Sequence, residues 1–153
     1  MSSHPPVKTV FTTVFMATLS LLAGALHAST AVAAEPQVEV MQLLKTTQSW
    51  DGVQYRKYPE GQPEVSVLRY KIPAHSSLPW HTHPVVNVAY VLSGHLTVIR
   101  KDNGKTLVIG PGDVLPELVG AFHRGESGDE PVELIVFYAG TPTVPLTVKS
   151  EPD

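Results

Sequence analysis

Two histidines separated by one residue, His81 and His83, form the pattern in this chain best suited to binding a metal ion. Residues two apart on an extended strand point to the same face, so both imidazoles can reach one ion. A helix would turn the two side chains about 200° apart and prevent chelation. Paired imidazoles suit first-row transition metals. Two unrelated surface histidines would give the same pattern, so the pair alone does not decide between these interpretations.

The residues around the pair predict a strand that begins at the histidines and ends in a turn. Pro73 and Pro79 precede the pair and disfavour a helix on its approach. The segment 85–92 is rich in valine, which favours strands, and a Ser-Gly turn follows at 93–94. We therefore expect both imidazoles at the start of a strand and on one of its faces.

The rest of the chain reads as short strands separated by turns. The apolar phase of the segment 65–72 shifts near its middle, which a β-bulge or burial on both faces would explain. The sequence Asp102-Asn103-Gly104 predicts a tight hairpin, because Asn-Gly supplies the positive φ angles of such a turn. Strands of this length and spacing favour an all-β barrel or double-sheet jelly roll. Further predicted strands are 95–100, 105–109, 114–119 and 132–138, with candidate opening strands at 38–44 and 52–58 and a candidate edge strand at 144–148.

Composition and charge narrow the function classes. The 153 residues allow one domain, and 14 prolines and 11 glycines suit a turn-rich β domain. A formal charge of −3 without a basic patch predicts no nucleic-acid partner. The absence of cysteine excludes disulfides and thiol nucleophiles. Phosphate-binding loops, dinucleotide fingerprints and nucleophile elbows are also missing from the sequence.

The first 34 residues have the pattern of a secretory signal peptide. Lys8 precedes an uncharged apolar run from residue 10 to 26, and small residues follow up to Ala34. Threonines and a serine interrupt the run, which is short for a membrane span, so we expect no membrane insertion after cleavage. Cleavage after Ala34 fits best, and cleavage after Ala28 is the alternative. The prediction is a periplasmic or secreted protein with one domain over residues 35–153.

Two separated motifs within residues 65–138 resemble those of the cupin superfamily. The first cupin motif has His-x-His, then Glu, then Gly, and this chain has its histidines, Asn87 and Gly94 at those spacings. The second motif begins with Gly and continues with Pro-x-Gly, then His, then Asn. Its counterparts here are Gly112, Leu118-Val119-Gly120, His123 and Ser127.

The resemblance implies a cupin-type double-stranded β-helix, that is, a jelly-roll barrel. It further implies one divalent transition metal, of Fe, Mn, Zn, Ni or Cu, held by His81, His83 and His123. Asn87 stands where cupins usually carry Glu, so it either ligates through its amide oxygen or hydrogen-bonds a bound water. Loss of that carboxylate leaves a neutral three-histidine site with the full charge of the ion, which favours anionic ligands. Cupins often dimerise through an edge strand, so the resemblance is also compatible with a homodimer.

Glu117 is a second candidate for the missing carboxylate. It lies in an otherwise apolar predicted strand, where carboxylates are rarely placed without a partner. It could serve as a fourth ligand or a general base, or it could be an ordinary surface residue. His75 and His95 match no motif position, and we expect both to be exposed.

These observations predict a periplasmic metal-dependent cupin that binds a small molecule. Some cupin dioxygenases use three histidines without Glu, so the ligand set resembles that of an oxidoreductase acting on a small enolisable or phenolic compound. The alternative is a barrel that captures a sugar or an organic acid without turnover.

Overall fold

The computed structural model describes residues 37–150, and within that range all regular structure is β-strand. From Glu39 onward the chain folds as one compact unit. None of the described residues forms a helix long and apolar enough to cross a membrane. The strands are β1 (Glu64–Ile72), β2 (His81–Thr82), β3 (Val86–Ser93), β4 (Leu96–Arg100), β5 (Thr106–Ile109), β6 (Val114–Pro116), β7 (His123–Ser127), β8 (Val132–Gly140) and β9 (Val148–Lys149).

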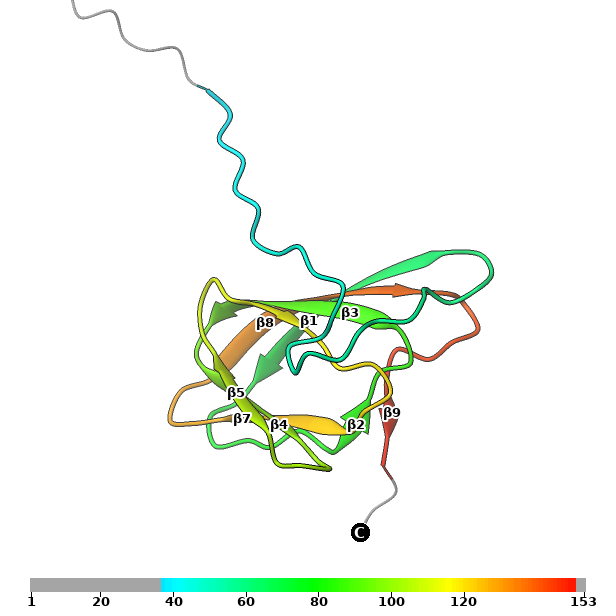
Figure 1. The fold of residues 1–153 in the computed structure, drawn as a ribbon. Coiled ribbons are helices and arrows are strands. Elements are labelled where there is room, and N and C mark those ends of the chain that lie inside the picture. The colour runs from blue at the N-terminus through cyan, green and yellow to red at the C-terminus, as the bar shows by residue number, and fades with distance from the viewer. Residues whose placement is uncertain (1–36, 151–153) are drawn as a thin grey trace, which may run out of the picture. The chain divides into compact units, whose positions relative to one another are not determined.

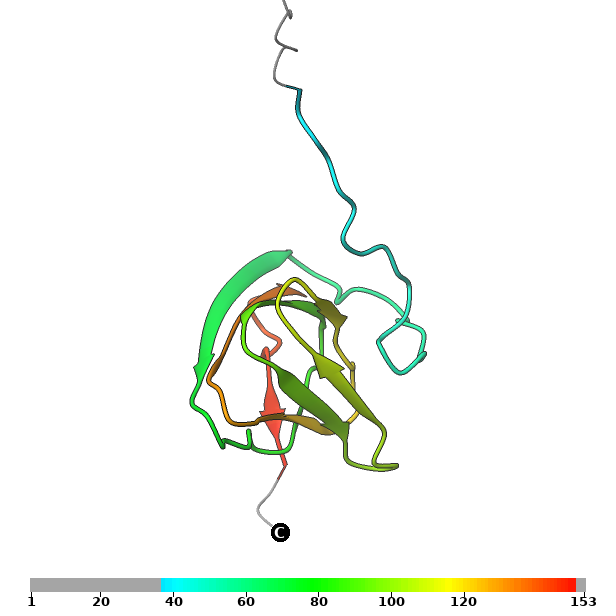
Figure 2. The same ribbon diagram turned by 90° about the vertical axis from the view of Figure 1, so that its left-hand side faces the viewer.

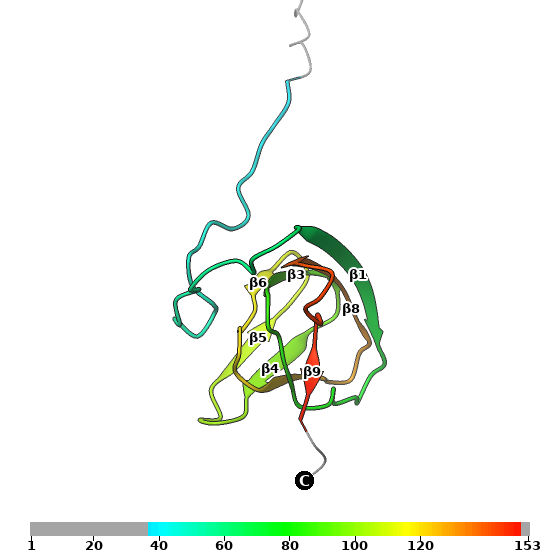
Figure 3. The ribbon, with the colours of Figure 1, turned by 90° about the vertical axis from the view of Figure 1, so that its right-hand side faces the viewer.

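These strands form two antiparallel sheets. One has four strands in the order β1-β8-β3-β6, and the other has five in the order β5-β4-β7-β2-β9 (Figure 1). Turned views show the two sheets facing each other around a common interior (Figure 2). β9, in red, faces the viewer in Figure 3, and it pairs with β2 at the edge of the five-stranded sheet. Apart from the β4–β5 hairpin, consecutive strands lie in different sheets, so the architecture is the expected all-β jelly-roll barrel.

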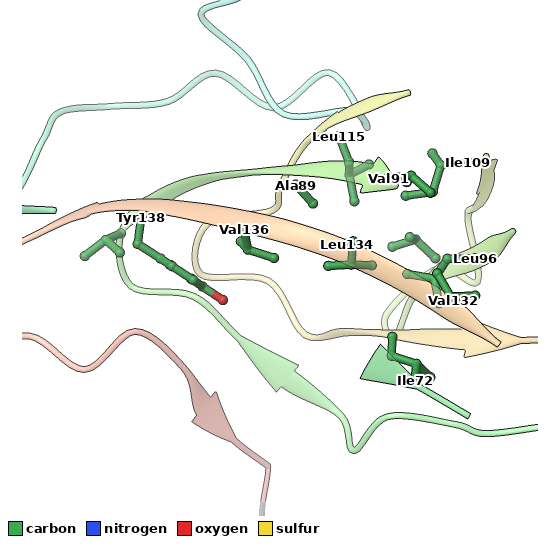
Figure 4. Close-up of a cluster of buried hydrophobic side chains, with 12 residues drawn as sticks. Ile72, Ala89, Val91, Leu96, Ile109, Leu115, Val132, Leu134, Val136 and Tyr138 are labelled. Carbon is green, nitrogen blue, oxygen red and sulfur yellow. The ribbon is translucent and has the colours of Figure 1, made fainter. Parts of the chain in front are cut away.

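The core lies between the two sheets because inward and outward residues alternate along each strand. On β8, Val132, Leu134, Val136 and Tyr138 are all buried, while Phe137 between the last two is exposed. Figure 4 shows Tyr138 at one end of this row and Val132 at the other. Aliphatic side chains from β1, β3, β4, β5 and β6 complete the cluster. The inward face of the barrel is therefore apolar except near Tyr138.

Gly94 ends β3 in a turn that no other residue would fit. Its φ is +73°, in the left-handed region that glycine tolerates best. A Cβ at this position would lie 2.3 Å from the carbonyl oxygen of Pro131. The glycine therefore lets the chain pass close to the start of β8.

The phase shift in β1 comes from apolar residues on both faces. The pairing of β1 with β8 is regular from Glu64 to Ile72, so a bulge is excluded. Ile72 and Tyr70 lie on the inner face, whereas Val65 and Val67 point outward and are 66% and 59% exposed. Edge position explains part of this exposure, since β1 pairs with β8 alone.

The β4–β5 hairpin is confirmed, but its turn differs from the prediction. Gly104 has a φ of +67°, whereas Asn103 has none of the positive φ expected for it. The chain instead makes a longer turn, in which the N–H of Arg100 donates to the carbonyl of Lys105 at 2.9 Å and the N–H of Gly104 to that of Arg100 at 3.0 Å. The Asn103 side chain accepts a hydrogen bond from the Lys105 N–H at 2.9 Å, which stabilises this turn.

The two opening strands were predicted wrongly. Residues 38–44 form no strand, and the segment 52–58 takes part only in an isolated bridge between Gln48 and Gln54. Val38 and Val40 are almost fully exposed, so this segment packs against no sheet despite its apolar side chains. The predicted signal peptide, residues 1–34, lies outside the described residues.

Candidate metal centre

Three histidines meet on the inner face of the five-stranded sheet: His81 on β2, His83 just after it, and His123 on β7. The single strand predicted from the histidines to the Ser-Gly turn is in fact two strands, because β2 ends at Thr82 and β3 begins at Val86 in the other sheet. His81 of β2 lies directly opposite His123 of β7, and directly opposite residues in an antiparallel pair point the same way. His83 follows two residues later and shares that face, as the spacing predicts. Ring centroids are 4.6 Å apart for His81 and His123, 4.9 Å for His81 and His83, and 5.1 Å for His83 and His123. One ring nitrogen of each lies within 4.8 Å of one in each of the others.

Backbone carbonyls fix which nitrogen of each ring is free. A carbonyl oxygen can only accept, so each Nδ1 that contacts one carries the proton, and the lone pair remains on Nε2. Outer partners of this kind are typical of histidines that ligate metal ions. The acceptors are the oxygens of Pro79 for His81 at 2.8 Å, Leu146 for His83 at 2.8 Å and Ala121 for His123 at 2.9 Å.

Glu117 brings a carboxylate to the same point. It follows β6 directly, and its Oε2 atom lies 3.3 Å from Nε2 of His123. Neither atom has a hydrogen-bond partner among residues 37–150, although both are buried. With its proton on Nδ1, neutral His123 presents a lone pair to a carboxylate that also offers only lone pairs. Two groups that offer only lone pairs need a cation between them. Adjacent ligand atoms that each lie about 2.1 Å from one metal ion are about 3 Å apart, which agrees with the observed separation.

The pKa values show that the site favours neutral imidazoles near β2. Burial lowers the pKa of His81 to about 4, although the hydrogen bond to Pro79 opposes it. Burial also lowers the pKa of His83. A neutral imidazole is the form that ligates metals, so these two rings are ready to bind an ion below neutral pH.

His123 and Glu117 behave differently because they face each other. Burial acts to lower the pKa of His123, but the Glu117 carboxylate outweighs it and the net shift is upward. Burial acts to raise the pKa of Glu117, but the three histidines, His123 first, hold it below its usual value. Both shifts describe a site where a positive charge between the two groups is stabilising. A proton satisfies this need in part, and a divalent ion would satisfy all four side chains, so the donor set fits a transition metal.

The histidines line a cavity of about 270 Å³ inside the barrel. Its remaining walls are mostly apolar and come from the inner faces of both sheets, including Leu96, Val98, Leu115, Leu134 and Val136. Concave apolar pockets with a few convergent polar groups are the usual form of a small-molecule site.

Two tyrosine hydroxyls supply the polar groups opposite the histidines. Tyr70 and Tyr138 line the cavity, and their oxygens lie 3.1 Å apart, within hydrogen-bond distance. The Tyr138 ring lies edge-on to His83, with centroids 5.6 Å apart. Burial raises the pKa of Tyr138, as does the hydrogen bond with Tyr70, so the phenol stays protonated as a donor. Sequence reasoning missed both residues, because on periodicity alone each reads as an ordinary core position.

The C-terminal segment 144–149 forms the last wall of the site. Its β9 pairs with β2, in agreement with the predicted edge strand but shifted to Val148–Lys149. The carbonyl of Leu146 orients His83, and Thr147 and Lys149 line the cavity. No motif marks these residues in the sequence. Only the pairing of β9 with β2, which lies far from it in the sequence, reveals them.

Asn87 is fully buried on β3 but does not line the cavity. Its side-chain N–H donates to the carbonyl of Val85 at 3.2 Å, and its Oδ1 has no partner among the described residues. The backbone carbonyl of Asn87 accepts a hydrogen bond from the Glu117 N–H at 3.1 Å. This contact places Asn87 behind the residue that supplies the carboxylate, and a ligand role for Asn87 stays a prediction.

Within residues 37–150, the two histidines outside the motifs lie away from the cavity. His75 sits in a loop, 3.8 Å from Asp129, and His95 lies 2.6 Å from Glu130. Both side chains are exposed, as expected. They serve as matched controls for the three inner histidines.

Family comparison agrees with the barrel and the histidine geometry. Residues 68–138 match the family described as Cupin domain. This match confirms, over these residues, the resemblance to the cupin superfamily that the two motifs predicted. A search of curated protein sequences found no significant match.

Solved structures share the fold at low sequence identity. The DMSP lyase DddQ from Ruegeria pomeroyi DSS-3 is 22% identical with a TM-score of 0.52, over 58% of this chain and 44% of that one. The polyketide cyclase RemF from Streptomyces resistomycificus is 21% identical with a TM-score of 0.50, over 58% of this chain and 62% of that one. The match thus spans about half the length of these proteins. Identities this low establish the common barrel only.

Proposed function

We propose that this protein is a metal-dependent cupin enzyme of the dioxygenase type, acting on a small enolisable or phenolic compound. The observation that carries the proposal is the convergence of three histidine Nε2 lone pairs and an unpartnered Glu117 oxygen at the wall of an apolar cavity. Four such donors leave room on a transition ion for a further ligand. A metal site with only a structural role is usually fully coordinated by protein ligands, whereas here the free coordination position would face the cavity.

His81, His83, His123 and Glu117 are the residues that hold the ion in this proposal. When bound, a transition metal supplies Lewis acidity towards an enolate or phenolate oxygen, and access to dioxygen chemistry. The replacement of Glu by Asn at position 87 is compensated by Glu117, which follows β6 and faces His123. The carboxylate of the usual motif is thus supplied by another strand.

The remaining cavity residues bind and orient the substrate. The Tyr70–Tyr138 pair shares one hydrogen bond between two hydroxyls, so one proton stays available to donate to a substrate oxygen. The aliphatic wall excludes water from the reacting end. With Oε2 of Glu117 committed to the ion, the second oxygen of the same carboxylate is the basic group that accepts the proton an enolisable substrate loses on binding.

Metal analysis followed by oxygen uptake tests the proposal. We expect about one equivalent of a first-row transition metal in protein purified at neutral pH, and oxygen consumption with one member of a panel of diketones, flavonols and thiols. Protein that binds metal and a small organic ligand but consumes neither oxygen nor ligand is the non-catalytic binding barrel instead. Protein that takes up no metal would refute the metal-dependent enzyme and leave only a metal-free binding barrel.

Export to the periplasm is also part of the proposal, and the leader pattern of residues 1–34 supports it. Intact mass of the exported protein tests it directly. We expect a chain that begins close to Glu35. Retention of residues before Ala28 in that product would refute it.

A further inference from the structure

We propose that Lys149 is a specificity-determining residue that makes the cavity select small organic monoanions with an apolar body. The inference rests on the proposed function, because it names the substrate class of the same site. It concerns the C-terminal wall of the cavity, which the metal ligands do not explain.

Strand register places Lys149 beside the metal centre. β2 lies between β7 and β9, and His81 is directly opposite His123 on one side and Lys149 on the other. Directly opposite residues share a face, with Cβ atoms about 5 Å apart. The row His123, His81, Lys149 therefore crosses the inner face of three neighbouring strands.

The alternation along the C-terminal segment agrees with this placement. Thr147 lies two residues before Lys149 and shares its face, and both line the cavity. The Thr147 hydroxyl lies 3.4 Å from Nδ1 of His83. Val148, between the two, is not among the residues that line the cavity.

The charges of the wall favour an anion at this end. Among described residues that line the cavity, the charged side chains besides the histidines are Glu117 and Lys149. Glu117 faces His123 and belongs to the metal set. The ammonium of Lys149 is therefore the charge at the rim that remains for a ligand, next to the ion that the histidines would hold. A carboxylate or enolate oxygen between the two would be attracted by both.

The apolar walls of the cavity determine the polarity and size of the other end of the ligand. Leu96, Val98 and Leu134 offer no hydrogen bonds, so a second charged group would be buried there without a partner. A volume of about 270 Å³ lies near the lower end of the range usual for small-molecule pockets, about 300–1,000 Å³. The fitting ligand is a small acid with one anionic end and an aromatic or branched aliphatic body.

Benzoate and benzamide test this selectivity, because they match in size and differ in charge. Calorimetric titration into metal-loaded wild type is expected to show tighter binding of benzoate. Lys149→Gln should weaken benzoate about fivefold, the value of one partly exposed ion pair, and leave benzamide and metal content unchanged. Lys149→Arg should retain the preference. Lys57→Gln is the matched control, since Lys57 is an exposed lysine paired with Glu60 and does not line the cavity.

Several outcomes would overturn the inference. They are an equal ratio of the two affinities in wild type and Lys149→Gln, or no binding of either probe to wild type. Lys149→Met, of similar length and without charge, repeats the measurement should the glutamine variant misfold. The same titration with metal-free protein separates the two proposals. Metal uptake without an effect of Lys149 refutes only the specificity, whereas a Lys149 effect in protein that takes up no metal refutes only the metal-dependent function.

Discussion

Asp51 and Glu117 are both carboxylates largely removed from solvent, with side chains 1% and 12% exposed, but their oxygens are treated differently. Oδ1 of Asp51 accepts from the Ser49 hydroxyl at 2.6 Å and from the Val53 N–H at 3.1 Å, and Oδ2 accepts from Arg100. Oε2 of Glu117 has no hydrogen-bond partner within the described part of the chain. The first carboxylate is saturated, and the second is left open.

This difference separates a structural carboxylate from a functional one. Asp51 joins the loop before β1 to Arg100 at the end of β4, so its bonds hold two distant segments together. A buried polar atom without a partner costs about 1–3 kcal/mol. The barrel tolerates this cost at Glu117, where the unpartnered oxygen faces the Nε2 atom of His123. Such a pair is expected where a bound cation completes the site.

The largest predicted effect removes a histidine from the open site. His123→Ala or His83→Ala should weaken metal binding more than about 100-fold, because even loss of an outer partner costs 10–100-fold. A competitive chelator titration with Co²⁺ measures the affinity. His75→Ala and His95→Ala are the controls and should bind like wild type. Full metal occupancy in either inner variant would exclude the three-histidine centre.

Asp51→Asn is the matching test at the saturated site. It should lower the free energy of unfolding by about 2 kcal/mol, since the amide can replace only some of the bonds that Asp51 accepts. Arg100 keeps Asp102 as a second partner, which limits the loss. Urea denaturation measures the stability, and metal affinity should not change. A stable variant with weakened metal binding would reverse the roles we assign to the two carboxylates.

Glu117→Gln should have a smaller effect than Asp51→Asn, and it should change metal affinity rather than stability. Metal affinity should fall about tenfold, because a neutral amide replaces the anionic ligand. Metal-free protein should lose no stability, since the new amide can donate to the lone pair of His123 that the carboxylate opposed. Chelator titration and urea denaturation of the same preparation give both values. Loss of stability without loss of metal affinity would make Glu117 a structural residue.

The sequence predicts the site features that depend on neighbouring residues and misses those that depend on which strands pair. His81 and His83 follow from a period of two on a strand, and His123 follows from the spacing of the second motif. The orientation of Glu117 depends on β6 pairing with β3, which places its N–H on the carbonyl of Asn87. The sequence shows a carboxylate in an apolar segment but not which partner it meets.

The errors have the same origin. Residues 38–44 are apolar enough for a strand, but a strand also needs a sheet edge, and none receives them in the described fold. The reverse holds for Lys149, which reads as a tail residue and gains its place only because β9 pairs with β2. Local patterns determined the strands and the metal motif, whereas strand order determined which residues complete the cavity.

The smallest predicted effect is a pH dependence confined to the saturated site. Burial acts to raise the pKa of Asp51, but its bonds to Ser49, Val53 and Arg100 outweigh it, so the pKa lies below the usual 3.8. The unfolded chain therefore binds the proton first as the pH falls. The stability that Asp51 contributes is complete above pH 3.8 and is lost as the pH falls through the lower folded value.

Unfolding free energies of wild type and Asp51→Asn should thus differ by a constant amount from pH 7 to 5 and converge below pH 4. Taking the difference cancels the histidines, including His81 with its pKa of about 4, because both proteins contain them. A difference that is unchanged down to pH 3 would show that the carboxylate of Asp51 is not stabilised in its charged form.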